Sequence, residues 1–265
     1  MLSDSKFRRS PSSAATVLVV SCALFGCGAH PSGNALAHAE QVAASCPTDG
    51  RRIAAYVASD ESGTGRGETA GTARQQVIRD AAERTAICGG HLRVTAFSGS
   101  MIGVTVFDGD LQLDGATTNA RLRKAPKVVD AVMEELNATL PESATQLTDG
   151  ATDIVGQYQH AAEYIAQLAT SGQYQLELSI LTDGIQTAGS DLGDLALTPE
   201  QATALATGFV VPELPGATVH LIGIGRQADN APLPTPYIAA LRAFHTAVCE
   251  RTHGTCTVVT DAAGA

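Results

Sequence analysis

The sequence contains no tryptophan, and aromatic residues make up only 4% of its 265 positions. Hydrophobic residues still account for 44% of the chain, which is enough to build a sizeable core. That core must therefore consist mainly of Val, Leu, Ile and Ala. Such an aliphatic composition is typical of a parallel sheet that is covered by helices on both faces.

Positive charge is also scarce. The chain has 17 Lys and Arg against 27 Asp and Glu, which gives a formal net charge of −10. A small basic run at 121–124 precedes a predicted helix and is typical of a solvent-exposed helix face. Phosphate contacts need clustered basic residues, so the composition argues against nucleic acid and favours cationic partners.

Familiar catalytic patterns are missing as well. The sequence has no HExxH or GxSxG motif, and its glycine-rich segment at 63–67 lacks the lysine of a P-loop. A haloacid-dehalogenase-like phosphatase is a weaker alternative, because Ser62 stands where the second aspartate of a DxDxT motif would supply the general acid. The lysine expected further downstream is absent too. We therefore expect a protein that is not an enzyme.

The N-terminus indicates export. Basic residues precede an apolar run at 14–25, which is too short to span a bilayer and is typical of a secretory signal. The segment Leu24-Phe25-Gly26-Cys27 resembles a bacterial lipobox, which implies acylation of Cys27; Cys22 fits the pattern with a shorter apolar run. We expect a signal peptide at 1–26, a flexible tether at 27–45 and one domain at 46–263, held on the extracytoplasmic face by lipid.

Apolar and amphipathic segments alternate along the domain. Strands are predicted at 53–59, 91–98, 103–113, 174–181, 217–224 and 256–260, and helices at 73–87, 126–139, 153–169, from 199, and 236–251. The short link at 99–102 predicts an antiparallel hairpin. The order predicts an α/β fold, a doubly wound three-layer sandwich with a six-stranded, mostly parallel sheet and one antiparallel edge strand.

Four cysteines lie beyond Cys27, an even number that predicts two disulfides in an exported chain. Cys46 precedes the first strand and Cys88 ends the first helix, so both lie where strands begin. Cys249 and Cys256 lie at the end of the last helix and the start of the last strand. This topology favours the pairs Cys46–Cys88 and Cys249–Cys256, although the sequence alone allows three connectivities.

Oxygen-bearing side chains gather at the opposite ends of these strands. Asp60, Ser62 and Thr64 follow the first strand, Thr152 precedes a helix, and Asp183 follows the strand at 174–181. Ligands of open α/β sheets bind at the carboxyl ends of the strands. Hard divalent cations prefer oxygen ligands. A cation site at this edge is therefore predicted.

In this order, the DxSxT, TDI and TDG segments resemble the metal-ion-dependent adhesion site of von Willebrand factor A domains. The resemblance implies strand order 3-2-1-4-5-6 with strand 3 antiparallel. It implies that Ser62, Thr64 and Thr152 touch Mg²⁺, with Mn²⁺ or Ca²⁺ as alternatives, while Asp60 and Asp183 act through water. A partner protein's Asp or Glu would complete the shell. The alternative is a metal-free scaffold domain of the cell envelope.

Overall fold

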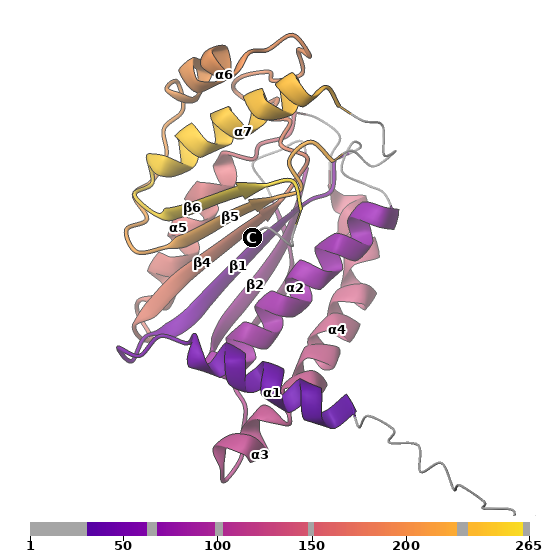
Figure 1. Ribbon diagram of the computed structural model, residues 1–265, viewed down its shortest axis with the longest axis vertical. Coiled ribbons are helices and arrows are strands. Elements are labelled where there is room, and N and C mark those ends of the chain that lie inside the picture. Colours follow the sequence, from indigo (N-terminus) through magenta and orange to yellow (C-terminus); the bar gives the residue numbers. More distant parts are fainter. Residues whose placement is uncertain (1–30, 63–67, 99–102, 148–150, 227–232, 262–265) are drawn as a thin grey trace, which may run out of the picture.

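The structure is a computed structural model that describes residues 31–62, 68–98, 103–147, 151–226 and 233–261. Its centre is a six-stranded sheet of order β3-β2-β1-β4-β5-β6 (Figure 1). The strands are β1 Arg52–Asp60, β2 Gly90–Phe97, β3 Val104–Leu111, β4 Tyr174–Leu181, β5 Thr218–Ile222 and β6 Thr255–Val259. All neighbouring strands are parallel except β2 and β3, which are antiparallel. The predicted fold class and the antiparallel edge strand are confirmed.

Helices cover the sheet on both faces. They are α1 Pro31–Ala44, α2 Glu68–Cys88, α3 Thr118–Leu122, α4 Ala125–Gln146, α5 Gly156–Leu168, α6 Pro199–Ala206 and α7 Thr235–Glu250. One core cluster joins α5, α6 and α7 to the sheet, and it contains the largest buried aromatic side chains, including Tyr158, Tyr164 and Phe244. The second joins α1, α2 and α4 to the other face and is almost entirely aliphatic.

Helix α1 corrects the expectation of a flexible tether at 27–45. Residues 31–44 form a helix that packs against α2, with Ala39 buried at 1% exposure. A hydrogen bond between the His38 ring and the Glu83 carboxylate of α2 adds to this contact. Small residues gave the segment a linker-like composition, but small side chains also let one helix approach another closely.

The helix α4 also runs further than predicted. It begins at Ala125, with Pro126 in its first turn, and continues to Gln146 through Pro141. Proline removes one helical hydrogen bond and usually ends a helix. The helix continues here past Pro141, and Ser143, two residues after this proline, is buried.

Both predicted disulfides are present. Cys46 pairs with Cys88, and Cys249 pairs with Cys256. Each lies at the edge of the sheet where the parallel strands begin, so the opposite edge is free of these crosslinks. Among the described helices, none has the length and apolarity needed to cross a membrane.

Candidate functional site

Asp60 is the last residue of β1 and is fully buried. Its Oδ2 accepts a hydrogen bond from the Thr182 hydroxyl at 2.8 Å, and its Oδ1 accepts one from the Ser62 main-chain N–H at 2.9 Å. The bond to Thr182 follows from the pairing of β1 with β4, in which Ser59 lies beside Leu181. Both donors are neutral, so the aspartate carboxylate is fixed in direction without an opposite charge from either of them.

Two residues beside Asp60, Glu61 and Arg74, were not predicted as site residues from the sequence. The guanidinium of Arg74, on α2, donates to the main-chain carbonyl of Asp60 and lies 3.8 Å from the Glu61 carboxylate. Glu61 also accepts a hydrogen bond from the Ser59 hydroxyl at 2.8 Å. An arginine facing a glutamate across 13 residues of sequence gives no periodic signal, so only the folded structure reveals it.

Asp183 lies just beyond β4 and is 1% exposed. Its Oδ1 accepts a hydrogen bond from the Ile185 N–H at 3.0 Å, and its carbonyl accepts one from the Gly225 N–H at 2.7 Å. Gly184, between them, has a φ of 87°, and a side chain there would meet Ile224 at 2.9 Å. The TDG segment therefore needs its glycine to turn the chain sharply beside the carboxylate.

Thr152 is tied to the same loop. Its N–H donates to the Thr187 hydroxyl at 2.6 Å, and its carbonyl accepts from the N–H groups of Thr187 and Ala188 at 3.1 Å. Gln186 completes the connection, because its fully buried amide oxygen accepts from the N–H groups of Ile154 and Val155. The loop before α5 is therefore fastened to the loop after β4, in which Asp183 lies.

A buried histidine supports the TDG turn from behind. His245, on α7, is fully buried, and its Nε2 lies 2.8 Å from the Gly184 carbonyl oxygen. Burial lowers the pKa of His245 to about 4, and the bond to Gly184 opposes this only in part. The imidazole is therefore neutral at pH 7 and donates from Nε2 to this carbonyl.

The predicted site residues thus divide into those that the structure describes and those that it does not. The structure joins Asp60 and Ser62 directly, links Asp60 to Thr182 beside Asp183, and anchors Thr152 to the loop that follows Asp183. Thr64 and Cys27 lie outside the described residues. Thr182 was not predicted as a site residue, although its place in the TDG segment gave the signal needed to find it.

The chemistry of these donors fits a hard divalent cation. Within the described part of the chain, no three His, Cys, Asp or Glu side chains come together as a metal cluster. The predicted set contains just two carboxylates, and its other oxygens belong to hydroxyl groups. Carboxylates and hydroxyls are ligands that Mg²⁺ accepts, usually with several waters retained.

Comparison with known proteins gives similarities of structure alone. No protein-family description matches the chain, and no curated protein matches it in sequence. An aerotolerance-related membrane protein from Bacteroides fragilis is 13% identical at a TM-score of 0.40, over 78% of this chain and 91% of that one. The ArnB paralog VWA2 from Sulfolobus acidocaldarius is 12% identical at a TM-score of 0.37, over 80% and 42%. BatB from Bacteroides thetaiotaomicron, a conserved hypothetical protein, is 13% identical at 0.34, over 79% and 91%.

The sheet order, the single antiparallel strand β3 and the placement of the DxSxT and TDG segments after β1 and β4 agree with the expectation from the sequence. The chain therefore has the doubly wound, mostly parallel α/β topology that the resemblance to von Willebrand factor A domains implies.

Proposed function

We propose that this protein binds a divalent cation at the carboxyl ends of β1 and β4 and uses it to hold an acidic group of a partner protein. The hydroxyls of Ser62, Thr64 and Thr152 would contact the cation, and the carboxylates of Asp60 and Asp183 would hold its water ligands. The cation would supply an electrophilic position that a partner's carboxylate can occupy. Mg²⁺ suits this oxygen-rich set best, with Mn²⁺ and Ca²⁺ as alternatives.

The burial of Asp60 carries this proposal. A buried carboxylate is costly unless charge or hydrogen bonds compensate it, and the two hydrogen bonds that the described residues make to the Asp60 side chain come from neutral donors. The guanidinium of Arg74 contacts the main chain of Asp60 and faces Glu61. A bound cation would provide the compensation that these neighbours leave incomplete.

The two disulfides support an exported location, because such bonds persist in oxidising compartments. Together with the signal-like N-terminus, they favour a lipid-anchored protein that faces away from the cytoplasm. We propose no catalytic role, since none of the sequence patterns found is that of a known reaction centre.

Isothermal titration of the full chain with MgCl₂ and MnCl₂ tests the cation site. The wild type should bind one cation, and the double variant Asp60→Asn/Asp183→Asn should lose binding, because both charges disappear while the side-chain shapes are kept. Asp114→Asn is the matched control, since Asp114 is exposed beyond β3 at the other side of the sheet. Full binding by the double variant would show that the site is assigned wrongly. A wild type that binds neither metal would favour the metal-free scaffold.

A further inference from the structure

One face of strands β4, β5 and β6 differs sharply from the other. The side chains that face α5 and α7 are apolar and buried, including Leu178, Val219 and Leu221. On the opposite face the register places Ser179 beside His220 and His220 beside Thr257, and all three are half-buried. Parallel strands inside a doubly wound sheet are usually apolar on both faces. The alternation here indicates a face adapted to polar contacts.

A groove lies on this face, along the side of α2. Its cavity volume is about 280 Å³. The floor consists of aliphatic side chains from α2, β1 and β5, and the polar lining consists of Asp80, Arg84, Glu177, Ser179 and His220. In Figure 1, α2 lies beside β1 and β2 and leaves β4, β5 and β6 in view. The groove therefore combines an apolar base with a rim that is rich in hydrogen-bond acceptors.

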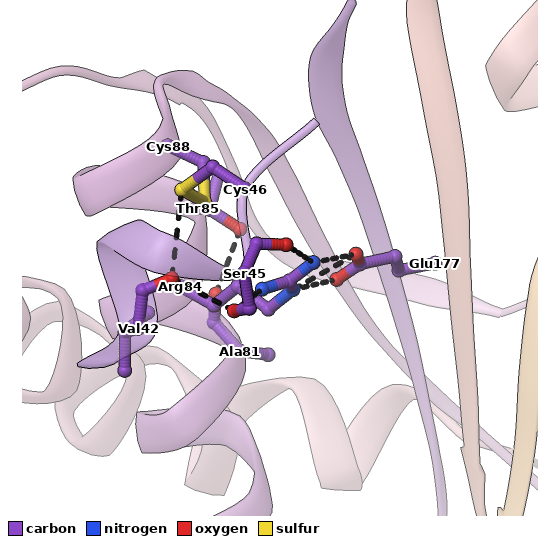
Figure 2. A network of polar contacts seen from close by, with 8 residues as sticks. All are labelled: Val42, Ser45, Cys46, Ala81, Arg84, Thr85, Cys88 and Glu177. Atoms are coloured by element: carbon purple, nitrogen blue, oxygen red, sulfur yellow. Dashed lines mark hydrogen bonds and ion pairs between the residues drawn. A yellow bond between two sulfur atoms is a disulfide. The ribbon is translucent and has the colours of Figure 1, made fainter. Parts of the chain in front are cut away.

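The arginine that lines the groove is already engaged. Arg84 Nε lies 2.8 Å from both carboxylate oxygens of Glu177, and its Nη1 donates to the Ser45 hydroxyl at 2.7 Å. Figure 2 shows this guanidinium held between Ser45 and Glu177, next to the Cys46–Cys88 disulfide. Since Arg84 and Glu177 neutralise each other, the remaining charge of the groove lining is the negative charge of Asp80.

His220 lines the groove next to Ser179. Its Nδ1 is covered by protein atoms and has no hydrogen-bond partner among the described residues. Burial, together with the nearby Arg84, lowers the pKa of His220, while Glu177 opposes this shift. The imidazole is neutral at pH 7, so it does not repel a cation in the groove.

We propose that this groove binds a lysine side chain presented by a partner protein. The aliphatic stem would lie on the apolar floor while the ammonium donates to Asp80 and Ser179, the arrangement by which long basic side chains bury their stems. The ammonium has three donors, and the rim offers the Asp80 carboxylate and the Ser179 hydroxyl as acceptors, which leaves the third donor to water.

The dimensions of the groove favour a side chain over a free small molecule. Pockets for drug-sized ligands occupy roughly 300–1,000 Å³, and this cavity lies just below that range. The groove is open along the sheet, where Thr218 and Thr257 extend the half-exposed polar surface. A partner's backbone can therefore remain outside while one side chain enters. This site lies on a face of the sheet and not at its carboxyl edge, so its test is independent of the cation.

The experiment is a ¹H–¹⁵N NMR titration of the full chain in EDTA with a blocked pentapeptide of alanines around a central lysine. We expect saturable shifts at the amides of Ser179 and His220. The same peptide with norleucine, which keeps the stem and loses the charge, should not reproduce them. Free n-butylammonium should bind at least about ten-fold more weakly, because it lacks the backbone contacts.

Two variants and one control complete the test. Asp80→Asn removes one exposed charge without disturbing the core and should weaken peptide binding about three- to five-fold. Ser179→Leu should fill the groove and abolish the shifts at His220, whereas Asp114→Asn should bind as the wild type does. Equal binding of the lysine and norleucine peptides, or wild-type binding by both groove variants, would overturn the proposal. Equal binding of butylammonium and peptide would overturn the choice of a protein partner.

Discussion

Acid should destabilise this protein through His245, and the amount can be worked out from its surroundings. The side chain is fully buried on α7, where its ring contacts that of Phe244 edge-to-face at 5.0 Å. The pKa of His245 is lowered to about 4 from an ordinary value of 6.5. Between these two values the unfolded chain binds a proton that the native protein does not bind. The free energy of unfolding must therefore fall as the pH falls through this window.

The size of the effect follows from the two pKa values. Integrating the proton uptake of this one group from pH 7.5 to 5.0 gives a loss of about 2 kcal/mol. The loss in the free energy of unfolding levels off at about 3 kcal/mol below pH 4, where His245 is protonated in both the native and the unfolded state. His220, whose pKa is also lowered, acts in the same direction, so the total slope for the protein is steeper than the contribution of His245 alone.

Urea unfolding of the oxidised chain at pH 7.5 and 5.0, in EDTA, measures this loss. The variant His245→Gln isolates it, because the glutamine amide can still donate to the Gly184 carbonyl but does not titrate. Carboxylates and His220 contribute equally to both proteins and cancel in the difference. The variant should lose about 2 kcal/mol less than the wild type over this interval. Equal losses in the two proteins would refute the reasoning.

Two further predictions concern backbone packing and anchoring. Gly90→Ala would place a methyl carbon 2.1 Å from a β1 carbonyl oxygen and should lower the free energy of unfolding in urea by about 2 kcal/mol or more. Gly71, on α2, has open space around it, so Gly71→Ala should raise the free energy of unfolding by about 0.5–1 kcal/mol. Similar effects of the two substitutions would contradict the close packing of β2 on β1. Incorporation of labelled palmitate in a bacterial host should be lost in Cys27→Ser and kept in Cys22→Ser; the reverse result would move the acylated residue to Cys22.

The sheet and its crosslinks could be predicted because they depend on patterns that the sequence carries locally. Each strand is a short run rich in Val, Ile, Leu or Ala, and each except the last is followed by a helix or, at 99–102, by a connection too short for one. Once the strand directions are known, Cys46 and Cys88 must lie at the same edge of the sheet. The disulfide pairing then follows from topology without any knowledge of side-chain positions.

Helices α1 and α3 could not be predicted in the same way. Helix α1 is mostly small and polar residues, and its contact with α2 depends on Ala39 and on a pair formed across 45 residues by His38 and Glu83. Helix α3 has five residues and buries Leu122. Neither segment repeats apolar residues for long enough to signal a helix by period alone.

The candidate site was predictable in position but not in detail. The sequence places Asp60 and Asp183 at the ends of strands, and parallel pairing brings those ends together. The hydrogen bond from Thr182 to Asp60 depends on the exact register of β1 and β4. The role of Gln186 depends on a loop that returns to the start of α5. Both contacts join residues that are far apart in the sequence, so no local sequence pattern predicts them.

The position of the Cys46–Cys88 crosslink determines how the domain can bear tension. This bond fastens the end of α1 to the end of α2, directly before β1 begins. Tension applied between the N-terminal side of the domain and the carboxyl edge of the sheet would act along β1. The hydrogen bonds that join β1 to β2 and β4 lie across this direction. Those bonds would be loaded together in shear, so rupture would require many to break at once. Strand β1 is thereby suited to carry load along its length.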